Sequence, residues 1–135
     1  MKGVVCLAAL IAAGCSGASL IAATGPLRGE FVIVEVDGAA VGAPVSATVT
    51  FEDDGAVTGD AGCNRFGGSF QQDGGAITIG PLMSSRRACE PQVMDVERRI
   101  LASLQASRSL TVGDDGAVLL SGDAPHRLRL QPVAR

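Results

Sequence analysis

Hydrophobic and polar residues alternate along much of this chain, which is the pattern of strands with one buried and one solvated face. The clearest stretch covers residues 45–51, where Val, Ala, Val and Phe alternate with Ser and Thr. Asp53, Asp54 and Gly55 follow it, and Asp-Gly sequences favour the tight turns of β-hairpins. We therefore predict a strand over 45–51 that turns back into a second strand over 56–59.

The same arrangement recurs twice more, around Asp73-Gly74-Gly75 and around Asp114-Asp115-Gly116. Each turn separates two short runs of strand-forming residues. The first predicted strand is nearly all apolar and is expected to be central in the sheet. Together the patterns predict further strands over residues 30–36, 69–72, 76–79, 109–112, 117–120 and 126–131.

One segment has the period of a helix instead. Between residues 91 and 104, Val93, Val96, Ile100 and Leu104 recur at spacings of three and four. Pro91 suits the first helical turn, where its missing N–H costs nothing. We predict an amphipathic helix over 91–104.

These elements predict an α+β fold that is mostly antiparallel β, a strongly curved sheet or small barrel with one packed amphipathic helix. The chain has 135 residues, which is one domain plus a leader. It has four Phe, no Trp and no Tyr, so aliphatic side chains must fill most of the core.

The leader begins with Lys2, continues with an uncharged run over 3–14 and ends in Ala12-Ala13-Gly14-Cys15. This is the layout of a secretory signal, and its end resembles the lipobox of bacterial lipoproteins. The resemblance implies a signal peptide over 1–14, lipid on Cys15 and a tether over 15–25. It also implies a cell-envelope location facing the periplasm, with Ser16 after the cysteine favouring the outer membrane. Cleavage without lipid, giving a soluble periplasmic or secreted protein, and an uncleaved anchor over 4–23 stay open.

Two cysteines, Cys63 and Cys89, remain once the leader and its acylated residue are set aside. In an oxidising compartment such a pair usually forms a disulfide. Cys63 follows a predicted strand and Cys89 precedes the predicted helix, so the bond would tie the helix N-terminus to the sheet. A redox-active or metal-binding pair and two free buried thiols remain as alternatives.

The block Gly62-Cys63-Asn64-Arg65-Phe66-Gly67-Gly68, with the later Ser85-Arg86-Arg87-Ala88-Cys89, resembles the META domain family. Its best known bacterial members are HslJ-like heat-shock lipoproteins. The resemblance covers residues 26–133 and implies a domain without established enzymatic activity, linked to heat or envelope stress. Arg87 stands where the family has an apolar residue, which makes this surface more basic.

Within that block, Asn64, Arg65 and Arg86 are the candidate binding or structural residues. Asn64 can close a turn on the backbone. Arg65 and Arg86 flank the expected crosslink and should lie near each other or near a common carboxylate. Two interpretations remain: the arginines bind an anion or carboxylate-bearing partner, or they hold loop carbonyls in place. Phe66 is expected in the core, and Gly67 and Gly68 allow close backbone approach.

Other signals of chemistry are weak, so we expect no catalytic residues, no metal site and no cofactor. The only histidine, His126, is expected to be exposed at a strand start, and the acidic turns are expected to be solvated. Without its leader the chain has ten arginines against 14 acidic residues, a net charge of about −4, which argues against nucleic-acid binding.

We expect a non-enzymatic, lipid-anchored envelope protein that is a monomer and is related to stress. Its expected partners are the membrane, through Cys15, and an unknown envelope protein or ligand. The alternative is a secreted small-molecule-binding or hydrolase-inhibitor barrel, and a wide apolar cavity would favour that function.

Overall fold

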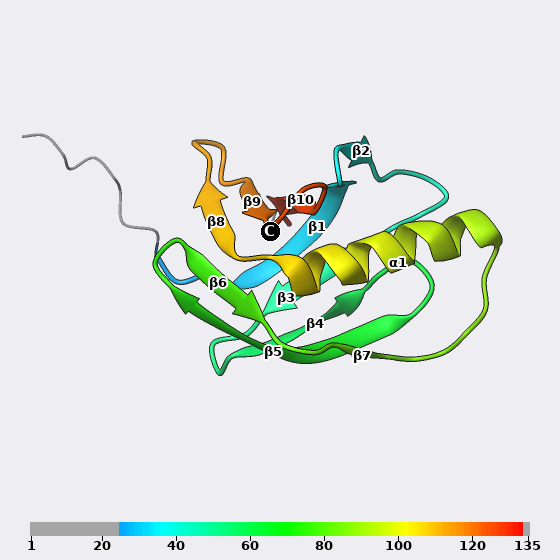
Figure 1. Cartoon of the computed structure of the whole chain (residues 1–135), viewed down its shortest axis with the longest axis horizontal. Helices are drawn as coiled ribbons and strands as arrows, with labels where there is room; N and C mark the ends of the chain where they lie inside the picture. The colour runs from blue at the N-terminus through cyan, green and yellow to red at the C-terminus, as the bar shows by residue number, and fades with distance from the viewer. Residues whose placement is uncertain (1–24, 134–135) are drawn as a thin grey trace, which may run out of the picture.

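The computed structural model describes residues 25–133, which form an antiparallel β-barrel with one helix packed on it (Figure 1). Eight strands follow one another around the barrel in the order β10-β9-β8-β6-β5-β4-β3-β1, and β1 pairs again with β10 to close it. Their bounds are β1 Gly29–Val36, β3 Thr48–Phe51, β4 Ala56–Asp60, β5 Arg65–Asp73, β6 Ala76–Ile79, β8 Ser109–Val112, β9 Val118–Ser121 and β10 Arg127–Pro132.

Three elements lie outside this ring. The two-residue strands β2 (Ala39–Ala40) and β7 (Met83–Ser84) pair with β1 and β5, respectively. Helix α1 (Pro91–Ala106) crosses the barrel in Figure 1 between the β8–β9–β10–β1 half and the β3–β7 half. The predicted α+β barrel with one packed helix is confirmed.

The predicted strands agree with the observed ones except at two places, the first being β3, which begins at Thr48 rather than at Val45. Strand β5 begins at Arg65 rather than at Ser69, because Gly67 and Gly68 continue the pairing with β4. A Cβ atom on Gly68 would lie 2.9 Å from both Leu82 Cδ2 and Pro81 O. The expected close approach at these glycines is therefore present, but inside a strand rather than before it.

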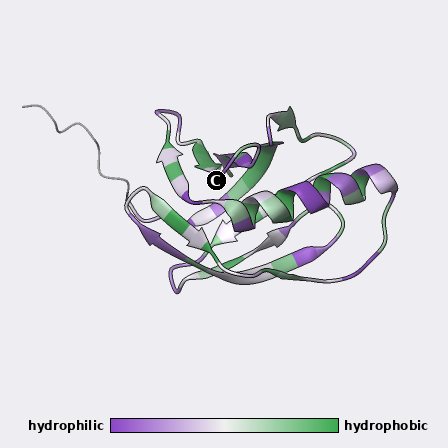
Figure 2. Ribbon diagram, viewed as in Figure 1, coloured by the Kyte–Doolittle hydropathy of each residue, from purple (hydrophilic) through white to green (hydrophobic). Residues whose placement is uncertain are grey.

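Apolar side chains fill the barrel, and Figure 2 shows hydrophobic and hydrophilic positions alternating along its strands. Val49, Leu128 and Leu130 are completely buried, as their alternation predicts. Strand β1 has a bulge between Ile33 and Glu35, which lets both Ile33 and Val36 face inward despite an odd spacing. The core thus consists mainly of Val, Leu, Ile and Phe.

Helix α1 begins at the predicted residue and runs two residues further than predicted. Ile100 and Leu104 are fully buried against the barrel, whereas Val93 and Val96 are only half-buried. Asp95 and Arg99 form the expected ion pair at 3.1 Å. The helix therefore packs most deeply through its second half.

The barrel has one weak seam. Strands β6 and β8 share a single residue pair, Ala76 with Ser109, whereas the other neighbours in the ring share four or more. Helix α1 contacts β6 on one side of this seam and β9 and β10 on the other. The helix therefore links β6 to the strands beyond the seam.

The predicted signal peptide over 1–14 and the lipid site Cys15 lie outside the described residues. Within residues 25–133, no helix combines the length and the apolar character needed to cross a membrane.

Candidate functional site

A disulfide joins Cys63, between β4 and β5, to Cys89, two residues before helix α1. The prediction that this bond ties the helix N-terminus to the sheet is confirmed. Cys63 is 2 % exposed, while Cys89 lies on the surface. In the chain-entropy account, a crosslink over 26 residues stabilises a fold by about 3 kcal/mol.

The turn that contains Cys63 is held by hydrogen bonds among residues 60–64. The Ala61 N–H donates to the Asn64 carbonyl at 2.9 Å, and the Gly62 N–H donates to Asp60 Oδ1 at 2.9 Å. Gly62 has φ of 118°, and a Cβ there would lie 3.1 Å from Val45 Cγ1. Residue 62 therefore needs to be glycine for two reasons: its positive φ and the lack of space for a side chain beside Val45.

The centre of the site is Glu97, a helix residue that is 4 % exposed. Its Oε1 accepts hydrogen bonds from the Cys63 and Asn64 backbone N–H groups, at 3.0 and 2.6 Å. Its Oε2 accepts a third bond from Asn64 Nδ2 at 2.7 Å. A buried carboxylate is costly unless its oxygens are bonded, and here three donors surround it.

Asn64 uses all four hydrogen bonds of its side chain. Nδ2 donates to Glu97 and to the Arg87 carbonyl, the latter at 3.1 Å. Oδ1 accepts from Ser85 Oγ at 3.0 Å and from the Arg87 N–H at 2.6 Å. The Asn64 side chain therefore does not close a local turn, as the sequence suggested. It joins the helix to residues 85–87, which lie more than twenty residues after Asn64 in the sequence.

These bonds fix a stretch of chain that is otherwise on the surface. Residues 83–90, which we call the clamped segment, are all exposed, and Met83 reaches 81 % exposure. The segment pairs with β5 through β7, is bonded by Asn64 in its middle and is crosslinked at Cys89. In Figure 1 it runs around one end of the barrel before α1 begins.

The arginines of the motif have different surroundings. Arg87 Nη2 donates to the Cys63 carbonyl at 2.8 Å, so the residue that departs from the family pattern helps to hold the turn. The backbone of Arg65 pairs with Ser85, next to Arg86. Within residues 25–133, neither the Arg65 nor the Arg86 guanidinium forms a hydrogen bond or ion pair, so no common carboxylate joins them.

A second polar cluster lies further along the helix. Ser103, fully buried, donates its hydroxyl to Asp37 Oδ1 at 2.6 Å and lies 3.0 Å from His126 Nδ1. Because the hydroxyl has a single hydrogen, this arrangement favours the tautomer in which Nδ1–H donates to Ser103. His126 is thus half-buried and bonded rather than exposed, because the β9–β10 turn folds against the helix.

The sequence reasoning missed Glu97 and Ser103. Both lie on the apolar face of the helix: Glu97 is four residues after Val93, and Ser103 is three after Ile100. A charged or polar residue at a core position was the available signal, because such a residue needs a partner when buried.

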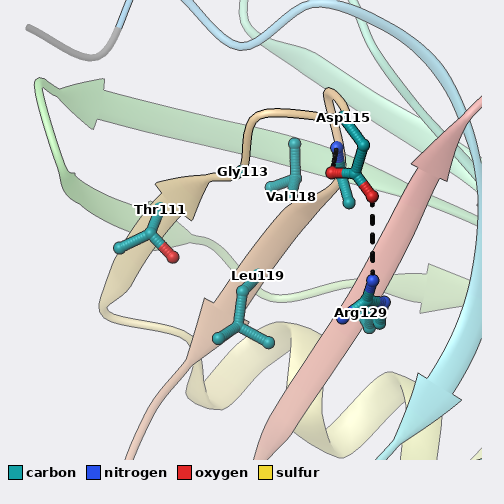
Figure 3. A pocket seen from close by; sticks show the side chains of 7 residues that line it. Thr111, Gly113, Asp115, Val118, Leu119 and Arg129 are labelled. Atoms are coloured by element: carbon teal, nitrogen blue, oxygen red, sulfur yellow. Dashed lines mark hydrogen bonds and ion pairs between the residues drawn. The ribbon is translucent and has the colours of Figure 1, made fainter. Parts of the chain in front are cut away.

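The remaining surface features are weaker candidates. Figure 3 shows a pocket of about 270 Å³ on the outer face of β8, β9 and β10, where Leu119 lies between Thr111 and Arg129. Its charged side chains, Asp115 and Arg129, are 3.8 Å apart and largely exposed. Within residues 25–133 there is no group of three or more potential metal ligands and no buried side-chain polar atom without a bond.

Comparisons with known proteins agree with the sequence motif and the fold. The family model of the META domain matches residues 25–134. A protein from Burkholderia xenovorans solved by NMR is 20% identical, with a TM-score of 0.63 over 90% of this chain and 100% of that one.

Two further solved structures share the fold. Another protein solved by NMR is 23% identical, with a TM-score of 0.62 over 77% of this chain and 88% of that one. A DUF4847 family protein from Bacteroides vulgatus is 14% identical, with a TM-score of 0.59 over 80% and 94%. No curated protein matches the chain significantly.

Proposed function

The chain belongs to the META domain family, and from this premise we propose that it is a non-enzymatic, lipid-anchored protein of the cell envelope. On this proposal it binds another envelope component through the clamped segment and serves in a stress response. The observation that carries the proposal is the clamped segment itself, a fully exposed stretch fixed by a disulfide and by Asn64. Fixing a binding surface in advance lowers the entropy lost on association.

The burial and hydrogen bonding of the polar side chains support a binding role over a catalytic one. Glu97 and Asn64 are buried and saturated with bonds to each other and to the backbone. Ser103 is fully buried, and its hydroxyl donates a hydrogen bond to the Asp37 carboxylate. A catalytic group needs access to a substrate, and these groups face the protein instead.

The barrel interior argues against the alternative of a small-molecule carrier. Ile33, Phe51 and Leu120, which point into the barrel, are at most 1 % exposed and belong to one continuous apolar cluster. A carrier would hold its ligand in an apolar cavity, whereas this interior is occupied by side chains. The binding surface is therefore proposed on the outside.

The anchor and the surface are tested separately in intact cells. Cys15→Ser should abolish acyl labelling and release the protein from the membrane fraction. Lipid that persisted on this variant would refute the anchor.

For the surface, a photo-crosslinking residue at Met83 should capture one defined envelope component. The same residue at Thr111, on the outer face of the opposite half of the barrel, is the matched control. Equal capture patterns at both positions, or capture of nothing at Met83, would refute the proposed surface.

A further inference from the structure

We infer that the clamped segment, together with Arg65 on the adjacent strand β5, docks a partner protein that presents an acidic surface to its exposed arginines. This inference rests on the proposed binding function and identifies the class of partner. Arg65, Arg86 and Arg87 are all exposed and lie at one end of the barrel, on β5 and on the segment paired with it. An arginine presents up to five N–H donors in a planar fork that fits a carboxylate.

The contrast with the other arginines shows that this end is unusual. Of the six other arginines in residues 25–133, all but Arg127 have an aspartate within 4.0 Å, namely Arg28, Arg98, Arg99, Arg108 and Arg129. In residues 25–133, no acidic group lies within that distance of Arg65, Arg86 or Arg87. The nearby Asp60 instead accepts the Gly62 N–H, and Glu90 makes no side-chain bond at the helix cap.

The backbone beneath these side chains is held firmly. Ser85 is hydrogen-bonded to Arg65 on one side and to Asn64 on the other. Arg87 is bonded to Asn64 through its backbone and to the Cys63 carbonyl through its guanidinium. A partner would therefore order only side chains and not the loop, which favours a defined complex.

The position of this surface favours a protein over the membrane as the partner. Strand β5 runs from Arg65 to Asp73, roughly 26 Å at 3.3 Å per residue. Gln72, at the far end, bonds the Gly25 carbonyl and the Leu27 N–H. The chain thus enters the barrel at the end opposite the arginines, so a tether from Cys15 would join the barrel at the end farther from them.

The two ends of the barrel also differ in their charged residues. The turns at the end where the chain enters contain Asp53, Asp54 and Asp73, whereas Arg65, Arg86 and Arg87 lie at the other end, beside Asp60 and Glu90. The unpaired guanidinium groups of Arg65 and Arg86 can steer an acidic partner towards this end before contact. Met83, exposed on β7 beside them, adds an apolar contact of the kind that is common in interfaces.

The test uses the full chain, purified in detergent, and a fluorescein-labelled glutamate-rich peptide as the probe. We expect saturable binding that weakens as salt is raised, and a loss of at least about tenfold in affinity for the double variant R65E/R86E. The double variant R108E/R129E makes a charge change of the same size away from the segment and should bind within about twofold of the parent chain. Because Arg65 and Arg86 are exposed and unpaired, the unfolding midpoint of R65E/R86E should equal that of the parent chain.

Three results would overturn the inference: no binding of the peptide, equal losses in R65E/R86E and R108E/R129E, or equally tight binding to phosphatidylglycerol vesicles. The last result would identify phosphate-bearing lipid as the ligand. None of them would affect crosslinking from Met83 in cells, so failure of the inference and failure of the proposed function are distinguishable.

Discussion

Helix α1 is fixed to the barrel by two buried polar clusters, and they differ in how completely they are enclosed. Around Glu97, every partner is a buried side chain or a backbone N–H, and a disulfide lies beside the cluster. Around Ser103, the hydroxyl is buried, but the side chains of Asp37 and His126 are 11 % and 32 % exposed. Water can replace lost bonds in the second cluster but not in the first.

The comparison also shows what polar residues add to an apolar helix face. Contacts through Ile100 and Leu104 stabilise the helix without strongly fixing its position along the barrel, because apolar contacts are not directional. Glu97 and Ser103, six residues apart, each bond to a defined turn. Two such bonds along one helix fix its rotation and its register together.

The largest effect is expected from Glu97→Ala. It leaves three donors without a partner inside the protein, and bonds to a charged acceptor contribute about 1.5–3 kcal/mol each, with some relaxation. We expect a loss of about 4 kcal/mol in the free energy of unfolding, measured by urea denaturation.

Glu90→Ala, at an exposed position before the same helix, is the control and should change stability by no more than about 0.5 kcal/mol. A loss at Glu97 no larger than that of the control would show that the carboxylate is not the centre of the cluster.

A somewhat smaller effect is expected from the double variant Cys63→Ser and Cys89→Ser. Removing the crosslink should cost about 3 kcal/mol. The variant should still fold, because Asn64 continues to hold the segment at Arg87. The bond itself is tested on the parent protein, whose intact mass should rise by two hydrogens on reduction. An unchanged mass would contradict the disulfide.

The smallest effect of the series is expected from Ser103→Ala, at about 1.5 kcal/mol. The hydroxyl loses two bonds, but both partners can turn to solvent. Ser109→Ala, where the hydroxyl bonds only the Ser121 hydroxyl at an exposed strand position, is the matched control and should be nearly neutral. If Ser103→Ala cost as much as Glu97→Ala, enclosure would not explain the difference between the two clusters.

The fold could be predicted from the sequence because its elements have strong local signals. Alternation predicted the strands, Asp-Gly turns their connections, and the spacing of Val96, Ile100 and Leu104 the helix. The start of β5 was placed late, since two glycines resemble a loop until their pairing with β4 is known.

The candidate site was predictable only in part. The leader and the cysteine count indicated the disulfide, and the family motif indicated Asn64. The role of Glu97 could not be derived in the same way, because its partners lie 33 and 34 residues away and are mostly backbone groups. His126 was misplaced for a similar reason: its neighbour Ser103 comes from a different element.

The single residue pair between β6 and β8 implies that local opening of the barrel occurs first between these two strands. Opening there would sever few backbone bonds, so amides of Ile77 and Leu110 should exchange with solvent sooner than those between β1 and β10. Such an opening would uncover two strand edges, which are templates for aggregation. Because helix α1 packs against β6 as well as against β9 and β10, its contacts would oppose such an opening.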